Sequence, residues 1–405
     1  MELRDKEITE QINNETTNEA SGADENSAPD TDKKRSFNPI KRMKEGGMFT
    51  LPFKVLCYAF VSALCVYVIS RFIPAFAEFW TRYPAQALRF VLAKLTGWFP
   101  FSLAECLIVS MPILAIGYIT ASSVSTSRDE SDRNFFRWLK PLVSVILVIA
   151  TIFLAGFGPA YGRYKLSDNL GLAQVPVSAE ELYSTSVKVC KDIKGVMSDV
   201  KFDANGSSVM PYGYAEMIDK VNEAYVKYAG SVDYISHFKS RPKAIALSEP
   251  MTYTHISGVY TFMTGESNIN TNYPDFLMPF TVAHEMAHQR GIAREDEANF
   301  VAFLVCINSD DAYIRYCGYA NMLNYLNSAL SRADSTLYKQ FFYENMPKKL
   351  TNEFVAYSDF FDKYRRSVAS AVTDTINDAF LQSQGQQAGT KSYGLVVDLA
   401  VAYYK

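Results

Sequence analysis

Three long apolar blocks dominate the first 160 positions of the chain. They cover about residues 51–73, 106–127 and 141–162, and charged residues occur only near the ends of the first block, at Lys54 and Arg71. Each block reaches the roughly 20 residues that an α-helix needs to cross about 30 Å of hydrocarbon. A buried helix of a soluble bundle seldom stays uncharged over such a length. The pattern therefore predicts three transmembrane helices.

The segment before the first block is polar, and its charge changes sign along its length. Residues 1–32 contain ten acids and two bases, with too little apolar surface to offset the entropy lost on ordering. Bases without an intervening acid then precede the block: Lys33, Lys34, Arg35, Lys41, Arg42 and Lys44. We predict that residues 1–48 form a disordered cytoplasmic tail that ends in a basic juxtamembrane cluster.

The distribution of bases also predicts how the spans are oriented. The N-terminal cluster and the 128–140 loop hold ten Lys and Arg residues, whereas the 76–100 loop and the stretch just after the third block hold five. Bases accumulate on the cytoplasmic side of membrane proteins. We therefore expect a cytoplasmic N-terminus and an extracytoplasmic location for everything after about residue 163.

The loop at 76–100 is unusually apolar for a connection between two spans. It alternates bases with large apolar side chains, namely Trp80, Phe90, Val91, Leu92, Leu95, Trp98 and Phe99. One interpretation is an interfacial amphipathic helix with tryptophans at the level of the lipid headgroups. The other is a hairpin packed on the spans. In either case residues 49–163 form the three-helix membrane region.

Residues 164–405 have the pattern of a folded α+β domain that is mainly helical. Helical periodicity is present at Leu182–Val200, at Tyr214–Ala229 and after Asp275, and strands are expected at Lys243–Leu247 and His255–Thr264. The six cysteines form no CxxC pair. A disulfide between Cys306 and Cys317 and free buried thiols are both compatible with their spacing.

The segment Pro279–Phe303 contains the clearest candidate chemistry. His284 and His288 belong to an HExxH sequence, and residues four apart lie on one face of a helix, so both imidazoles can reach one metal ion. Glu285 lies about 100° around the helix, where its carboxylate can reach a metal-bound water. We expect Glu285 to act as the general base.

A catalytic zinc site of this type needs a third protein ligand. Gly291 can end the first helix soon after His288, and a second helix then opens with Glu295 and Glu297. Glu295 shares a face with small residues that permit close packing, so we favour it as the ligand and keep Glu297 as the alternative. Asn299, one turn after Glu295, is expected to accept a hydrogen bond from a histidine N–H.

The run His284–His288 followed by Glu295-x-x-Ala298-Asn299 resembles the gluzincin metallopeptidases, in which the first Glu of such a second helix is the third ligand. The chain also resembles a bacterial family of polytopic membrane proteins known as a domain of unknown function. The matching stretches are Tyr83-Pro84, Phe99–Ser102, Met263–Asn270, Pro279–Phe300 and Ser392–Gly394. These resemblances imply a zincin-like domain with one Zn²⁺ per chain, anchored as a multi-pass protein in the bacterial inner (cytoplasmic) membrane with that domain periplasmic or extracellular.

Thr264, Gly265 and Glu266 precede the HExxH segment, where zincin folds place a strand that pairs with the substrate backbone. We expect them to line the substrate cleft, although a simple turn explains them equally well. The leading hypothesis is thus a membrane-anchored zinc metallopeptidase that hydrolyses a peptide or an envelope protein. The alternative is a non-catalytic envelope protein with a structural zinc site in a zincin-like domain.

Charge makes two other functional classes improbable. With 40 Lys and Arg residues against 43 Asp and Glu residues, no overall basic field attracts nucleic acid. No span has a charged residue near its middle. Because ion and proton pathways usually contain such residues, this argues against a transport path. The expected partners are therefore the lipid bilayer and a peptide or protein substrate.

Overall fold

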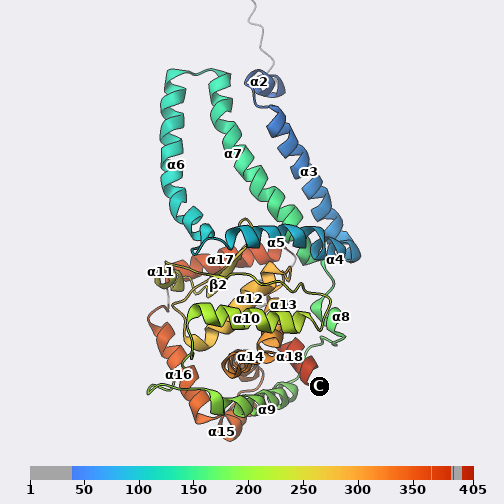
Figure 1. Cartoon of the computed structure of the whole chain (residues 1–405), viewed down its shortest axis with the longest axis vertical. Helices are drawn as coiled ribbons and strands as arrows, with labels where there is room; N and C mark the ends of the chain where they lie inside the picture. Colours follow the sequence, from blue (N-terminus) through green and yellow to red (C-terminus); the bar gives the residue numbers. More distant parts are fainter. Residues whose placement is uncertain (1–38, 366, 385, 387–394) are drawn as a thin grey trace, which may run out of the picture.

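The computed structural model describes residues 39–365, 367–384, 386 and 395–405, and it has two parts stacked along one axis. Three long helices project from a larger, mainly helical domain (Figure 1). These helices belong to segments that are long and apolar enough to cross a membrane: Leu51–Phe72, Leu103–Arg128 and Asp132–Gly162. The prediction of three spans is confirmed at this level. Of the disordered tail predicted at 1–48, residues 1–38 lie outside the described residues, whereas Pro39–Glu45 form a short helix, which corrects the prediction for that part.

The spans begin and end close to the predicted blocks. They comprise α3 (Leu51–Phe72), α6 (Leu103–Arg128) and α7 (Asp132–Ile152), and the last continues through a π-helical turn, η1 (Phe153–Phe157), and a 3₁₀ turn, η2 (Gly158–Gly162). The short α2 (Pro39–Glu45) precedes α3, and Arg42 Nε donates to Asp132 Oδ2 of α7 at 2.8 Å. The N-terminal bases and the start of α7 therefore lie together, at the end of the spans far from the domain.

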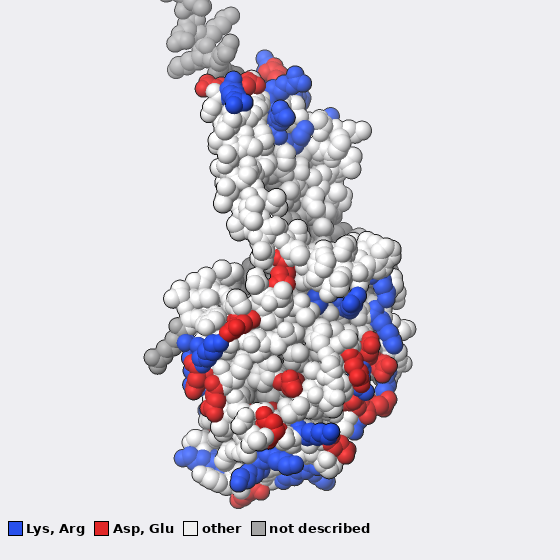
Figure 2. Space-filling model, turned by 60° about the vertical axis from the view of Figure 1, so that its left-hand side comes forward, with Lys and Arg blue, Asp and Glu red and all other residues white. Residues whose placement is uncertain are grey.

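Charged side chains are distributed as a membrane would require. Figure 2 shows the sides of the spans almost free of Lys, Arg, Asp and Glu, with charged residues gathered at their far end and over the lower part of the domain. This pattern agrees with the spans lying in hydrocarbon. The side of the membrane on which the domain lies remains a prediction.

The 76–100 region is helical and lies crosswise where the spans meet the domain (Figure 1). It forms α4 (Pro74–Arg82) and α5 (Pro84–Thr96). One face of this pair is buried and includes Ala77, Glu78 and Arg89, while Phe79, Leu95 and Trp98 are exposed. The pair thus has both a packed face and an apolar exposed face, so it combines features of the two interpretations of this region.

The domain consists of helices around one small sheet. Its helices are α8 (Leu166–Leu170), α9 (Ala179–Val196), η3 (Met197–Asp199), α10 (Tyr214–Ala229), α11 (Ser248–Thr252), η4 (Asp275–Leu277), α12 (Met278–Gln289), α13 (Glu295–Ile307), α14 (Ala312–Ala333), α15 (Ser335–Asn345), α16 (Lys348–Asp362), α17 (Val368–Ser383) and α18 (Val396–Tyr404). The main core lies between α9, α10, α12, α13, α14 and α18. The expectation of a mainly helical domain is confirmed.

The sheet has three strands in the order β1-β3-β2. The strands are β1 (Lys243–Ala244), β2 (Gly258–Thr261) and β3 (Glu266–Ile269), and β3 pairs in parallel with β1 and antiparallel with β2. The two predicted strands are thus shorter than expected. The central β3 is fully buried and carries polar side chains, which the hydrophobic pattern did not identify as a strand. The six cysteines, all within the described residues, are free, so Cys306 and Cys317 form no disulfide.

Candidate metal centre

The HExxH segment forms most of α12, and a sharp turn follows it. Pro279 lies in the first turn of this helix, where its missing N–H costs no hydrogen bond. Gly291 has a φ of 89°, a conformation that residues with a side chain rarely adopt, and Ile292 N donates to Ala287 O at 3.1 Å. The chain therefore reverses just after His288, and α13 packs against α12.

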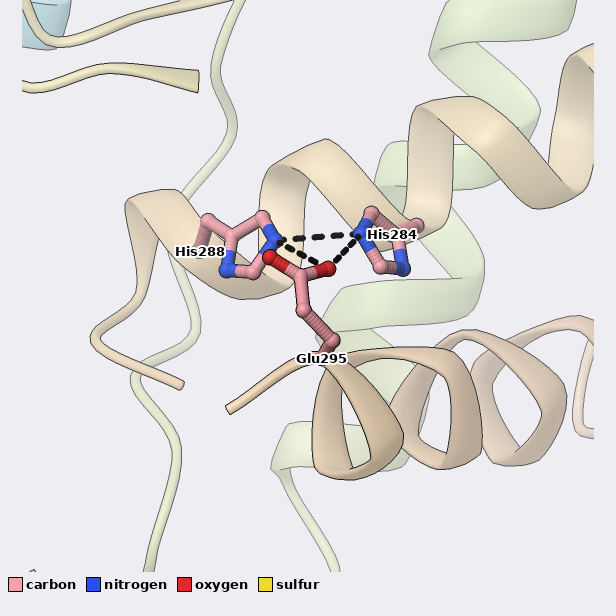
Figure 3. Close-up of side chains that lie close together, drawn as sticks. All are labelled: His284, His288 and Glu295. Carbon is pink, nitrogen blue, oxygen red and sulfur yellow. Dashed lines mark hydrogen bonds and ion pairs between the residues drawn. The ribbon is translucent and has the colours of Figure 1, made fainter. Parts of the chain in front are cut away.

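This reversal brings together three side chains that could hold a metal ion (Figure 3). His284 Nε2 and His288 Nε2 lie 3.0 Å apart. Glu295 Oε2, from the first residue of α13, lies 3.2 Å from His284 Nε2 and 3.5 Å from His288 Nε2. Among the described residues these three side chains form the cluster whose geometry suits a metal ion.

The donor atoms are spaced as a zinc site requires. Four ligands at the usual zinc distance of about 2.0–2.1 Å in a tetrahedron are about 3.3 Å from one another. The three separations in the cluster are 3.0, 3.2 and 3.5 Å. Two imidazole nitrogens and one carboxylate oxygen are also a known catalytic zinc donor set. The residues therefore fit Zn²⁺ in both spacing and chemistry.

Opposite charges attract the side chains of the cluster to one another. Burial lowers the pKa of His288, but the charge of Glu295 outweighs this effect and raises that pKa to about 9. Burial likewise raises the pKa of Glu295, yet the charge of His288 and the hydrogen bonds with both histidines bring that pKa well below its ordinary value. Glu295 is therefore ionised and held against the histidines.

His288 is also oriented by the backbone. Its Nδ1 lies 2.7 Å from the carbonyl oxygen of Ile292, so Nδ1 carries the proton and Nε2 is directed toward Glu295. His284 Nδ1 is buried and has no hydrogen-bond partner among the described residues. The turn at Gly291 thus has a second role, since it presents the carbonyl that orients one histidine.

Glu285 lies beside the cluster in an enclosed position. The backbone N–H of Tyr260, on the edge strand β2, donates to its carboxyl group, but its Oε2 has no hydrogen-bond partner among the described residues. Burial raises the pKa of Glu285, against the opposite effect of His284 and His288. A buried carboxyl group with one free oxygen and a raised pKa is suited to exchanging a proton.

Two of the predicted residues have other surroundings. Glu297 Oε1 accepts hydrogen bonds from Leu166 N at 2.9 Å and from Arg294 Nη1 at 2.8 Å, so it ties α13 to α8. The structure therefore brings Glu295, and not Glu297, to the histidines. Asn299 forms no described hydrogen bond to a histidine, and its Nδ2 is buried without a partner. The carbonyl of Ile292 has the orienting role that we expected of Asn299.

The predicted substrate-binding residues face the membrane helices. Glu266 is buried and accepts from the backbone N–H groups of Leu103 and Ala104 at the start of α6, at 3.1 and 2.9 Å. Gly265 has a φ of 69°, and a Cβ there would meet Leu92 of α5 at 2.6 Å. Thr264 is buried in the same turn. The contacts of Gly265 and Glu266 join the sheet to α5 and α6, as the alternative of a simple turn implies, and a part for this group in substrate binding stays a prediction.

Residues from the end of the third span complete the surroundings of the site. Phe157 of η1 packs edge-on against the His288 ring, with centroids 6.2 Å apart. Tyr161 of η2 packs against Phe157, and its carbonyl accepts from Arg294, next to Glu295. Sequence reasoning missed both residues because they belong to an apolar block. The glycines on either side of Phe157 were the available signal of an irregular helix end.

Comparison with known proteins finds one relationship. No curated protein and no solved structure matches the chain. One family model, described as "Protein of unknown function (DUF3810)", matches residues 80–401. The match includes the second and third spans, the domain up to residue 401 and the candidate metal centre. The chain therefore belongs to this family of proteins of unknown function, DUF3810.

Proposed function

We propose that this chain is a membrane-anchored zinc metallopeptidase with its domain on the outer side of a bacterial inner membrane. The observation that supports the proposal is the convergence of His284, His288 and Glu295 beside the buried carboxyl group of Glu285. Structural zinc sites usually have four protein ligands, whereas a catalytic site has three and leaves one position for water. A hydrolytic site also needs a proton acceptor beside that water, and the buried Glu285 carboxyl group is suited to this role.

The proposed roles follow from the positions of the side chains. His284, His288 and Glu295 would hold the ion, which would supply polarisation of a scissile carbonyl and a water whose pKa is lowered toward about 7. Glu285 accepts a proton from the attacking water and delivers it to the leaving amine. The Tyr260 N–H and the contact with Gly258 hold the Glu285 carboxyl group in one orientation. The substrate is a peptide or an envelope protein.

Metal content tests the ligand set. We expect about one zinc per chain in detergent-purified protein, and loss of this zinc in His284→Ala and Glu295→Gln. The matched control is Glu297→Gln, which keeps the shape of a side chain that bonds Leu166 and Arg294. Zinc lost equally in both glutamate variants, or absent from folded wild-type protein, would contradict the proposal.

Catalysis is tested separately at Glu285. The Glu285→Gln variant should bind as much zinc as wild type but hydrolyse peptides about 10²–10⁴-fold more slowly, because it removes the proton acceptor and leaves the ligands intact. The assay is cleavage of a peptide library and of envelope proteins by purified wild type and variant. Equal rates in the two proteins would refute the assigned role of Glu285.

The non-catalytic alternative has one observation in its favour. The ligand side chains are nearly enclosed, with exposed fractions of 13% for His284, 9% for His288 and 12% for Glu295. If the zinc is structural, its removal by a chelator should lower the melting temperature strongly, while wild-type protein cleaves none of the peptides or envelope proteins. Cleavage that depends on Glu285 would exclude this alternative.

A further inference from the structure

Helix α17 carries an apolar stripe that is mostly exposed. Val368, Val372, Ile376 and Phe380 follow one another at intervals of four and therefore share one face of the helix. Their exposed fractions are 81%, 52%, 65% and 40%. Two side chains of the helix, Ser370 and Leu381, are buried. An isolated helix of this length has only marginal stability in water. Packing of its apolar stripe against another apolar surface would stabilise it.

The C-terminal end of α17 is attached to the outer end of the first span. Arg71, in the last turn of α3, donates from Nη1 to the carbonyl of Gln384 at 2.8 Å, and Tyr67 Oη donates to Gln384 Oε1 at 3.1 Å. Arg71 is the charged residue that ends the first apolar block. Because such residues extend toward the headgroups, Gln384 lies at the level where the hydrocarbon ends.

The N-terminal end is connected to the outer end of the second span. Ser367, which caps α17, donates to the carbonyl of Tyr253, just after α11. Just before α11, the N–H groups of Ala246 and Leu247 donate to the Glu105 carboxylate at 2.9 and 2.7 Å. Glu105 lies in the first turn of α6. Both ends of α17 are thus linked to residues that mark one boundary of the membrane.

The resulting helix lies crosswise at the level where the spans enter the domain (Figure 1). Its stripe also reaches the end of the third span, since Phe380 packs against Phe153 and Tyr161 at centroid distances of 6.2 and 6.4 Å. The helix contains two acids and no Lys or Arg. Attraction to anionic headgroups therefore cannot hold it at a membrane, and apolar burial has to do so.

We propose that α17 is an interfacial helix whose stripe of Val368, Val372, Ile376 and Phe380 lies in the outer leaflet of the bilayer that the three spans cross. The occupant of this surface is lipid, because the stripe continues the apolar surface of the spans at the same level. Its contact with lipid does not require that the site bind zinc or cleave peptides.

Tryptophan quenching by brominated lipids tests this surface in the full chain. We would place Trp at Ile376 and at Val372, and, as the matched control, at Asp374, which is exposed on the opposite side of the same helix. The variants and wild type are reconstituted in phosphatidylcholine vesicles with and without bromine on the acyl chains. Wild-type emission from the native tryptophans is subtracted, and an unchanged melting temperature verifies folding.

We expect bromine to quench about half of the added fluorescence of Ile376→Trp and of Val372→Trp, and little of that of Asp374→Trp, at low and high salt alike. A photoactivatable phosphatidylcholine should also label α17 in wild-type protein, which needs no substitution. Equal quenching at all three positions, or no quenching and no labelling, would overturn the proposal. The latter result would be expected if a second copy of the chain covered the stripe.

Discussion

The surroundings of Glu285 illustrate how closely single residues are fitted at this site. Its side chain lies under the edge strand β2, and Gly258 is the strand residue directly above it. A Cβ at Gly258 would lie 2.7 Å from both Cγ and Oε1 of Glu285 and 2.9 Å from Thr281 Cγ2. Sequence reasoning predicted the importance of Glu285 from the HExxH spacing. It could not predict the requirement at Gly258, because that depends on contact between a strand and a helix.

We predict that Gly258→Ala displaces the Glu285 carboxyl group and destabilises the domain by about 1–3 kcal/mol, the usual cost of overpacking a filled core. Thermal unfolding of the purified variant measures the change. Gly195→Ala is the control, since a Cβ at that helical position meets no atom within 4 Å and should stabilise the helix slightly. A Gly258→Ala protein as stable as wild type would contradict this account of the contact.

At the level of elements, one arginine joins the membrane region to the turn after the HExxH helix. Arg163 follows η2, and its Nε and Nη2 donate to the two carboxylate oxygens of Glu78 on α4 at 2.9 and 2.7 Å. The same side chain donates to the carbonyls of Gly291 and Tyr234 at 3.0 and 2.8 Å. The exposed fractions of the Arg163 and Glu78 side chains are 5% and 12%. The turn that positions Glu295 is therefore held from the membrane side.

Replacing Arg163 with Met should cost about 3–5 kcal/mol of stability, because the buried Glu78 carboxylate then keeps only the longer ion pair with Arg82 Nη1 at 3.7 Å, and the carbonyls of Gly291 and Tyr234 lose their donor. The double variant with Glu78→Gln should recover part of that loss. Melting curves of the single and double variants in detergent give the coupling between them. The exposed pair Lys363–Glu249 serves as the control, and its removal should leave the melting temperature unchanged. A loss of similar size for both pairs would show that burial of the Arg163 pair is unimportant.

At the scale of the whole molecule, the candidate metal centre lies next to the end of the third span. The π-helical and 3₁₀ turns that end the third span contribute Phe157 and Tyr161 to the surroundings of the cluster. The N-terminal bases and the start of α7 lie at the opposite end of the spans (Figure 1). If these bases are cytoplasmic, the site lies close to the outer surface of the membrane.

Reporter fusions test this orientation. Green fluorescent protein on the N-terminus should fluoresce, and alkaline phosphatase joined after Lys405 should be active, because the first reporter folds in the cytoplasm and the second outside it. The reciprocal fusions should both be inactive and serve as controls. Fluorescence from green fluorescent protein placed after Lys405 would show that the domain is cytoplasmic.

The features that follow from local chemistry could be inferred along the chain. The three spans, the helix at Tyr214–Ala229 and the turn at Gly291 each depend on residues within a few turns of one another, so periodicity and glycine placement reveal them. The spacing of His284 and His288 belongs to the same class. Helix faces favoured Glu295 over Glu297 as the third ligand. Which glutamate lies beside the histidines depends on how α13 packs on α12, so only the tertiary structure shows it.

The remaining features depend on contacts between distant segments. Glu266 binds the start of α6 across 162 positions, and Arg163 binds Glu78 across 85. The polar strand β3 is buried because partners elsewhere satisfy its side chains, so its hydropathy resembles that of a loop. No local pattern encodes such pairings, since charged and polar residues of these types are also stable when they are exposed to water. Folding decided them by burying each polar group only where another segment could bond it.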